Sequence, residues 1–575
     1  MSTTAATKPL PKHDPVDELV KAEVCLARFR DHISAGLAYL KEHCTADGVI
    51  SAARLDDHQQ VSYELAFCVA ELEAAAVVLQ YAQAKATQGD VLCTELALTF
   101  CAEQLNNLFH RLLGHGSDAG ISRGDMLQLM AEPAIDSFLT DHGSAERYAQ
   151  IGVALAARGT TQRLPSGLDQ EKDLVRESFA RFADEVVAPL AQEIHRFDTD
   201  IPDDLLQAAA EMGCFGSCIP ERFGGLMPDD GHDSLGMLVV TEELSRGSLG
   251  AAGSLITRPE IAARALLEGG TEAQKSTYLP RFATGEWLAA ISITEPDYGS
   301  DVASLSLRAT PTEGGWVLNG AKTWCTFAGK ADVLVVIART EPDPSLGHRA
   351  LSMFLVDKPR FAGHDFCWDN ASGGKLTGHA IPTIGYRGMH SFELSFVDLF
   401  VPETALVGGA QGRGRGFYLT MAGLSGGRIQ TAARATGVMQ AALDQAVTYT
   451  QDRQVFGRAI GDYQLTQVKL GRMYAALTAS RQFSYAVARL MDGGGGRMQA
   501  SLVKLYACRA SEWVTREALQ IHGGMGYAEE SPVSRYFVDA RVLSIFEGAE
   551  ETLALKVVAR ELISNGTAVL TEPAR

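Results

Sequence analysis

The hydrophobic pattern of this chain changes its period at about residue 288 and changes back at about residue 416. Between these points, short β-branched or aromatic runs stand between turn residues, a pattern typical of antiparallel strands. These runs are residues 291–294, 316–318, 333–337, 351–356 and 392–396. On both sides, apolar residues recur at the three- and four-residue spacing of amphipathic helices. The sequence therefore predicts a mainly α-helical protein with a central antiparallel β domain.

The helical patterns outside the β region fall into three blocks. The first carries long runs at residues 16–41, 59–86 and 91–113 and is followed by a polar connector at 158–165. A chain of 575 residues is too long for one ordinary core. We predict four domains: an extra N-terminal helical domain (1–160), a helical domain (166–287), the β domain (288–405) and a C-terminal helical bundle (406–575).

Composition and charge narrow the class of protein. With 46% hydrophobic residues and a mean hydropathy of -0.01, the chain is typical of soluble globular proteins. Its net charge of -19 argues against nucleic acid or an anionic membrane as a partner, because both would be repelled. We find no apolar run of about 18 residues and no secretory segment. The ten cysteines lack zinc spacing, so we expect free thiols in a reducing cytoplasm and no metal.

One stretch near the C-terminus, residues 520–556, combines a glycine cluster with an isolated acid. An apolar helical run ends at Gly523 and Gly524, where backbone N–H groups are bare and a phosphate or a flavin ring could approach closely. Glu547 follows two apolar residues and precedes Gly548. Partial desolvation favours the neutral form of such an acid, which suits a general base. The alternative is a capped helix with an ordinary loop acid.

Two stretches of the β region place polar and aromatic groups at strand ends. A strand ends in Thr294 and turns into a loop that contains Ser300, so hydroxyl and N–H groups project from a rigid edge. In the second stretch, residues 319–326, Trp324 precedes Thr326 by two positions. An aromatic residue buried in a sheet is the alternative interpretation of Trp324.

The spacing of these residues resembles the acyl-CoA dehydrogenase family. The positions that match its C-terminal signature are Gln520, Gly523, Gly524, Gly526, Tyr527, Glu530, Arg535 and Asp539. Glu547 falls on the family's catalytic base, and family motifs cover about residues 168–565. The resemblance implies the family's α, β, α architecture, here with the extra N-terminal helical domain, and FAD as the cofactor.

The resemblance also implies two groups of FAD contacts. One lies against the flavin, with Trp324 covering the ring and Thr326 bonding N5: Ile293, Thr294, Ser300, Trp324 and Thr326. The other matches residues that reach the FAD of a neighbouring subunit: Arg453, Phe456, Gln464, Gln520, Gly523 and Gly524. We therefore expect a homo-oligomer. No strand is followed by GxGxxG, so a nicotinamide cofactor is not expected.

The chain departs from the family pattern at Ser292 and Tyr298, which leaves the fit of that loop to its ligand open. It also departs at Ala549 and Glu551, so the flavin contacts usual at these two positions are not carried over.

The implied reaction is the α,β-dehydrogenation of a CoA thioester. Glu547 would remove the α-proton while the β-hydride passes to flavin N5 on the opposite face. Ser300 would face the flavin or the pantetheine, and the helix of Arg428 would line the acyl-CoA site, although a surface cation is the alternative for Arg428. Gly548, beside the base, is a further predicted substrate contact. Electrons are expected to leave to electron-transfer flavoprotein.

Several tracts resemble the branch of the family that oxidises methylsuccinyl-CoA to mesaconyl-CoA in the ethylmalonyl-CoA pathway: residues 245–263, 373–399, 427–438 and the long helical N-terminus. A free distal carboxylate needs a cation or several donors in an otherwise apolar pocket. Arg246, Thr257 and Arg258 lie in the segment that, by family resemblance, lines the acyl pocket. Arg387 is a more distant candidate.

Other functions stay open at this stage. A short or branched-chain monocarboxylic acyl-CoA dehydrogenase, or a flavin oxidase of the same fold, would share these motifs. A helical scaffold that has lost its flavin is the alternative of a different class. We expect the N-terminal extension to cover the bundle face through which relatives form dimers of dimers, which would leave a homodimer.

Overall fold

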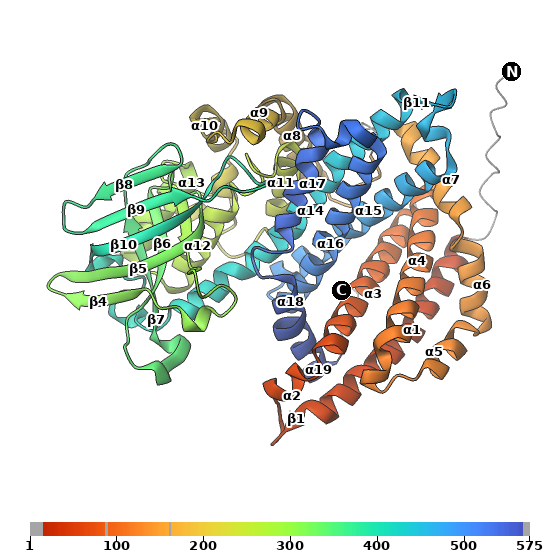
Figure 1. Cartoon of the computed structure of the whole chain (residues 1–575), viewed down its shortest axis with the longest axis horizontal. Coiled ribbons are helices and arrows are strands. Elements are labelled where there is room, and N and C mark those ends of the chain that lie inside the picture. The colour runs from red at the N-terminus through yellow and green to blue at the C-terminus, as the bar shows by residue number, and fades with distance from the viewer. Residues whose placement is uncertain (1–14, 87–89, 160–162, 567–575) are drawn as a thin grey trace. The chain divides into compact units, whose positions relative to one another are not determined.

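The structure is a computed structural model that describes residues 15–86, 90–159 and 163–566, and it divides into two compact units (Figure 1). Unit 1 comprises the described residues of Met1–Asp173, Val438–Val487 and Gly496–Arg575. Unit 2 comprises Leu174–Gly437 and Ala488–Gly495. The predicted N-terminal extension therefore belongs to the same compact unit as most of the C-terminal bundle.

Unit 1 begins with the helices of the extension. They are α1 (Pro15–Cys44), α2 (Ala52–Asp56), α3 (Gln59–Ala86), α4 (Val91–His115), α5 (Arg123–Met130), α6 (Pro133–His142) and α7 (Ala145–Arg158), with a small hairpin of β1 (Thr45–Ala46) and β2 (Val49–Ile50) after α1. By length and composition, α3 is the one described helix that could cross a membrane, but 83% of its apolar window is buried inside the protein. This burial is typical of a core helix.

The remaining helices of unit 1 form the bundle. It contains the last part of α14 (Gly416–Asp452), the hairpin of β11 (Gln454–Val455) and β12 (Arg458–Ala459), α15 (Gln464–Asp492), α16 (Arg497–His522), α17 (Pro532–Leu543), α18 (Glu550–Thr552), a π-helical segment (Leu553–Ala559) and α19 (Arg560–Asn565). The π-helical segment separates α18 from α19.

The extension and the bundle share one core. Arg509 of α16 lies over the ring of Phe67 in α3 at 3.6 Å and donates to the hydroxyl of Tyr63 at 2.6 Å. A Cβ added to Gly152 of α7 would lie 2.0 Å from the carbonyl oxygen of Gln467 in α15, so the two backbones touch directly. The extension (1–160), which the sequence separates from the bundle by its boundaries, therefore packs against the bundle within one compact unit.

The helical part of unit 2 precedes the sheet in sequence. Its helices are α8 (Gln170–Phe182), a π-helical segment (Ala183–Val187), α9 (Ala188–Phe197), α10 (Asp203–Glu211), α11 (Ser234–Gly247), α12 (Thr257–Gly269) and α13 (Glu272–Thr284). Local sequence signals explain two of the helix starts. The Asp233 carboxylate accepts from the backbone of Gly236 at the start of α11, and Thr271 and Gln274 form a capping box at the start of α13.

The sheet of unit 2 contains β3 (Ala289–Ser292), β4 (Arg308–Thr312), β5 (Gly315–Thr326), β6 (Val333–Arg339), β7 (Leu351–Asp357), β8 (Asp365–Asp369), β9 (Lys375–Ala380) and β10 (Ser391–Pro402) (Figure 1). The strand order is β3-β6-β4-β5-β10-β9-β8, and β7 pairs with β6. Alternate residues such as Leu318, Phe354 and Phe396 are buried in its core.

The helix, β, helix order predicted from the sequence is confirmed, but the sheet is mixed. The antiparallel expectation holds for β5 against β4 and β10 and for β6 against β7. It is wrong for β6 against β3 and β4, which are parallel pairs. The reason is topological: β6 follows two intervening strands, so the chain returns beside β3 in the same direction.

Candidate active site

Glu547 stands at the tip of a tight turn between α17 and α18 in unit 1. The turn is closed by the Glu550 N–H, which donates to the Ser544 carbonyl at 3.1 Å. Glu547 is half-buried and has φ of 56°, a left-handed backbone conformation that non-glycine residues seldom adopt. Gly548 follows with φ of 104°. Backbone strain of this kind gathers at functional sites, where the surrounding structure holds it.

Lys504 of α16 is hydrogen-bonded to the backbone of this turn. Its buried ammonium donates to the carbonyl oxygen of Gly548 at 2.7 Å. Lys504 was not among the site residues predicted from the sequence. Its signal was a lysine among apolar residues on a helical run, because a buried cation needs an acceptor. Lys504 therefore fixes the backbone beside the predicted base.

The six predicted cofactor contacts in unit 1 include four exposed side chains and two glycines. The ring of Tyr449 stacks on that of His522 at 4.2 Å, which brings the end of α14 beside the end of α16. Gly523 and Gly524 follow α16 with nothing within 4 Å of an added Cβ. Phe456, between β11 and β12, is 98% exposed with φ of 49°. The exposed positions also include Arg453, Gln464 and Gln520.

A second group of predicted site residues lies together at one edge of the sheet in unit 2. Ile293 and Thr294 are half-buried just after β3, and Ser300 is exposed in the loop that follows. The Thr323 N–H of β5 donates to the Thr294 carbonyl at 2.8 Å. This bond positions Thr294 beside the strand that carries Trp324.

A buried ion pair that was not predicted from the sequence supports this edge. The Lys322 ammonium lies 2.9 Å from a Glu295 carboxylate oxygen and donates to the Ile293 carbonyl at 2.7 Å. The same carboxylate accepts from the N–H and hydroxyl of Ser306 and from the Leu307 N–H. Burial by itself would raise the pKa of Glu295, but Lys322 and these donors hold it below its ordinary value.

Trp324 and Thr326 lie at the end of β5, and Thr326 is its last residue. Trp324 is 55% exposed and has φ of 57°, so the interpretation of a buried core aromatic does not apply. Thr326 is buried and its hydroxyl lies 2.9 Å from the Ser391 hydroxyl of β10. An indole turned to solvent by a left-handed backbone is available to cover a planar ligand.

The predicted substrate-side residues of unit 2 differ in how their side chains are engaged. The guanidinium of Arg246 makes ion pairs of 2.6 Å with both Glu243 and Asp184. The Thr257 hydroxyl is buried and donates to Gln430 at 2.7 Å, and it accepts from Arg434. Arg428 lies half-buried on α14.

Arg258 lies at the start of α12 and is buried. Burial raises the pKa of the Cys325 thiol to about 11, while the positive charge of Arg258 acts in the opposite direction. Arg258 is therefore near the strand that presents Trp324 and Thr326. It also lines a cavity of about 10 Å³ together with Leu255 and Met389.

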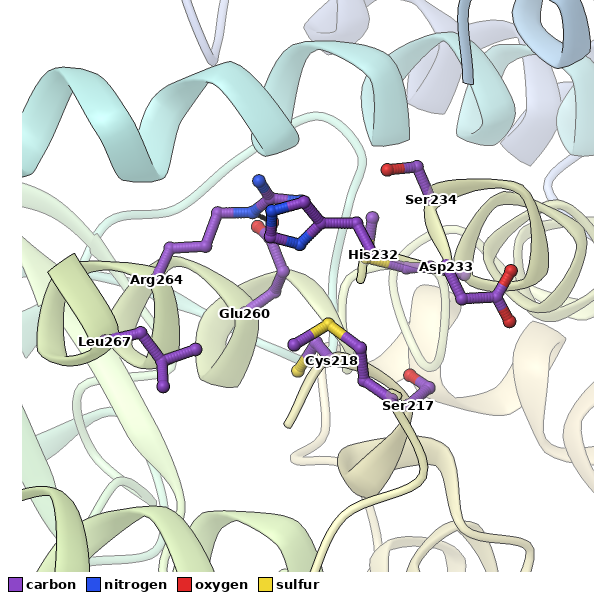
Figure 2. Close-up of a pocket in the computed structure, with 10 residues that line it drawn as sticks. Ser217, Cys218, His232, Asp233, Ser234, Glu260, Arg264 and Leu267 are labelled. Carbon is purple, nitrogen blue, oxygen red and sulfur yellow. Dashed lines mark hydrogen bonds and ion pairs between the residues drawn. The ribbon is translucent and has the colours of Figure 1, made fainter. Parts of the chain in front are cut away.

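The other cavities described within unit 2 are poor acyl-CoA sites. Figure 2 shows a cavity of about 20 Å³ where His232 and Arg264 lie beside Glu260. This volume holds one water molecule and no acyl chain. Burial lowers the pKa of His232, and Arg264 lowers it further. A groove of about 660 Å³ crosses strands β8 to β10, but Asp365 and Glu393 line it and would repel CoA phosphates.

Comparisons with known proteins show matches to one protein family along most of the chain. Models of the N-terminal, middle and C-terminal domains of acyl-CoA dehydrogenase match residues 169–286, 290–399 and 414–563. (2S)-Methylsuccinyl-CoA dehydrogenase of Cereibacter sphaeroides is 37% identical over 556 residues, which cover 95% of this chain and 98% of that protein.

Two solved structures resemble the chain in fold as well as in sequence. Butyryl-CoA dehydrogenase from Megasphaera elsdenii has a TM-score of 0.63 and 30% identity over 70% of this chain and 100% of its own. A structure described as the electron transferring flavoprotein of Acidaminococcus fermentans has a TM-score of 0.62 and 30% identity with the same coverage.

Proposed function

Because this chain belongs to the acyl-CoA dehydrogenase family, we propose that it oxidises (2S)-methylsuccinyl-CoA to mesaconyl-CoA. The family models begin at residue 169, so the N-terminal helices lie outside them. The match to the Cereibacter sphaeroides enzyme covers 95% of the chain and so includes most of these helices. This match over the extension is the observation that carries the substrate proposal.

FAD is the cofactor of the family, and the residues of this chain fit it. In unit 1, the open space above Gly523 and Gly524 admits close approach of a phosphate or a ring, and Arg453 is an exposed cation. In unit 2, the exposed indole of Trp324 and the buried hydroxyl of Thr326 follow each other on β5. When bound, FAD supplies the acceptor for the β-hydride.

Glu547 is the residue that we propose removes the α-proton. Two hydrogen bonds hold its turn. The Glu550 N–H donates to the Ser544 carbonyl, and the Lys504 ammonium donates to the Gly548 carbonyl. The carboxylate therefore needs little reorganisation when a thioester binds, and a base positioned in advance contributes about 10²–10⁴-fold to the rate. On the sheet edge, we propose that Thr294 contacts the flavin and that Ser300 contacts the flavin or the pantetheine.

Arg258 is the cation that we propose binds the distal carboxylate of the substrate. The sequence predicted Arg246 and Arg258 for this role, with Arg387 as a more distant candidate, and Arg246 makes ion pairs with Glu243 and Asp184. Arg258 is buried, lines a small cavity and lies near β5. A buried guanidinium binds a carboxylate with two parallel hydrogen bonds, which favours a dicarboxylic thioester over a monocarboxylic one.

The Arg258 assignment is tested with Arg258→Gln and, as the matched control, Arg246→Gln. Loss of a charged hydrogen bond of about 1.5–3 kcal/mol raises the KM for methylsuccinyl-CoA at least about tenfold. The KM for butyryl-CoA should stay near its original value. FAD content, measured by absorbance, shows whether each variant is folded. Equal effects on both thioesters would exclude Arg258 as the carboxylate-binding residue.

The function itself is tested by anaerobic bleaching of the flavin band at about 450 nm. Methylsuccinyl-CoA should bleach it at much lower concentrations than butyryl- or isobutyryl-CoA. Glu547→Gln should abolish bleaching while retaining FAD, and Glu551→Gln, an exposed acid one turn away, should bleach normally. Bleaching by the monocarboxylic thioesters alone would refute the substrate and leave the family.

For the assembly, we propose a cytoplasmic homodimer that passes electrons to electron-transfer flavoprotein. The shared core of extension and bundle in unit 1 supports an extension that covers part of the bundle surface. Light scattering should give the mass of two chains, and four would contradict the dimer. Reduction of purified electron-transfer flavoprotein by substrate-reduced enzyme tests the acceptor.

A further inference from the structure

Asp198, His364 and His390 gather at one point of unit 2, and none of the three is among the residues assigned to FAD or substrate. Asp198 follows α9, His364 precedes β8 and His390 precedes β10. One ligand atom from each lies within 4.8 Å of the others. We infer that these three residues form a binding site for a divalent transition-metal ion such as Zn²⁺.

Two distances in the cluster are close to the spacing of neighbouring metal ligands. Nε2 of His390 lies 3.3 Å from one carboxylate oxygen of Asp198, and Nε2 of His364 lies 3.5 Å from the other. A charged imidazole–carboxylate hydrogen bond measures about 2.7–2.9 Å. Neighbouring ligands of a tetrahedral ion with bonds of about 2.0–2.1 Å are about 3.3–3.4 Å apart.

An exposed pair on the same sheet shows the contrast. Nδ1 of His379 lies 2.6 Å from the Asp365 carboxylate, which is a direct hydrogen bond. The longer separations around Asp198 leave room for an ion between the ligand atoms.

A second carboxylate orients His390 for ligation. Nδ1 of His390 lies 3.0 Å from Asp200, whose other carboxylate oxygen accepts from the Gly363 N–H at 2.6 Å. Because an ionised carboxylate only accepts, Nδ1 donates to Asp200, and this contact turns Nε2 toward Asp198. Carboxylate-oriented histidines of this kind are typical of metal sites.

The groups that face Nε2 of His390 are all acceptors. They are the Asp198 carboxylate at 3.3 Å and the Asp198 carbonyl oxygen at 3.2 Å. A divalent ion bound here would take the place of the proton on Nε2, because metal ligands are deprotonated. The carbonyl oxygen is a candidate fourth ligand.

Two cations lie near the aspartates: Nε of Arg387 is 3.9 Å from Asp198, and the positive charge of Lys330 helps to hold the pKa of Asp200 below its ordinary value. Arg387 directs its donors to the carbonyls of Thr383 and His195. The side chain of His364 is 47% exposed, which gives an ion a path from solvent.

A bound ion would tie the end of α9 to the starts of β8 and β10. The carbonyl of His390 accepts from the Phe327 N–H at 2.8 Å, and the next residue, Ser391, contacts the Thr326 hydroxyl. A metal ion at this site would therefore stabilise the segment of β10 that contacts Thr326 at the end of β5.

The experiment measures Zn²⁺ binding to untagged holoenzyme after dialysis against a chelator, by calorimetry and by elemental analysis. Cys367→Ser is the parent, because this exposed thiol on β8 would bind zinc on its own account. The parent should bind one Zn²⁺ per chain and gain thermal stability. His364→Ala and Asp200→Asn should each weaken binding by at least about tenfold.

The matched control is His379→Ala, which removes the exposed pair of His379 and Asp365 and should leave zinc affinity unchanged. His364 is the chosen ligand variant because its side chain is half exposed, so its loss should not unfold the unit. Absence of saturable Zn²⁺ binding in the parent, or equal affinity in His364→Ala and His379→Ala, would overturn the proposal. The cluster would then be an imidazolium held by two aspartates.

Discussion

Replacement of Lys322 by methionine tests the support of the sheet edge that carries Thr294. The ammonium is fully buried, 2.9 Å from Glu295 and 2.7 Å from the Ile293 carbonyl. Methionine keeps the length of the side chain and removes the charge. Glu295 is then left in the interior with its bonds to Ser306 and Leu307 but without a cation.

The magnitude follows from the geometry of the pair. At 2.9 Å and an effective dielectric of about 20, the gross attraction is about 6 kcal/mol. Removal of one partner of a buried pair typically destabilises a protein by about 3–5 kcal/mol, because the remaining charge is uncompensated. We expect a loss in this range for unit 2, together with weaker FAD binding.

The sign of the pH dependence should reverse in the variant. The pKa of Glu295 lies below its ordinary value in the native protein, so the pair stabilises the fold above the ordinary pKa of about 4.3 and this contribution is lost on acidification. Without Lys322, burial raises the pKa of the carboxyl. Stability of the variant should then fall as the pH rises through the raised value.

The assay is hydrogen exchange of residues 290–298 and 318–327, with FAD release in urea as a second readout. Glu295→Gln combined with Lys322→Met should recover most of the loss, because no charge is left unpaired. A single variant within about 1 kcal/mol of the native protein, or a double variant no better than the single one, would refute the reasoning.

Three further predictions concern other buried contacts. Lys504→Met leaves the Gly548 carbonyl without its donor, which costs about 1–3 kcal/mol, and should lower kcat more than it raises KM in a dye-reduction assay. Unchanged kcat would mean that the Glu547 turn keeps its conformation without Lys504. Gly152→Ala should destabilise unit 1 by about 1–3 kcal/mol in thermal unfolding, because its Cβ would lie 2.0 Å from the Gln467 carbonyl; Gly114→Ala, with open space, should not. Burial lowers the pKa of Lys358 to about 7, so the unfolded chain binds more protons between about pH 7 and 10 and stability should rise with pH by up to about 1.4 kcal/mol per unit. Lys358→Met should remove that slope in denaturation at several pH values.

Much of the architecture was readable from local pattern. The change of hydrophobic period predicted the β region between helical blocks, because burial on one face imposes a period of two or of 3.6 on the residues themselves. The spacing from Gln520 to Glu547 likewise identified the family from one stretch. Such signals are local, so no tertiary contact is needed to recognise them.

Pairings between distant segments were decided only by the tertiary structure. The sequence could not show that β6 runs parallel to β3, or that the extension shares its core with the bundle through Arg509 and Gly152. Lys504 and Lys322 looked like ordinary lysines until their acceptors, 44 and 27 residues away, were placed beside them. The cluster of Asp198, His364 and His390 has no spacing motif for the same reason. Periodicity records which face of an element is buried, and only folding determines which distant polar group meets it there.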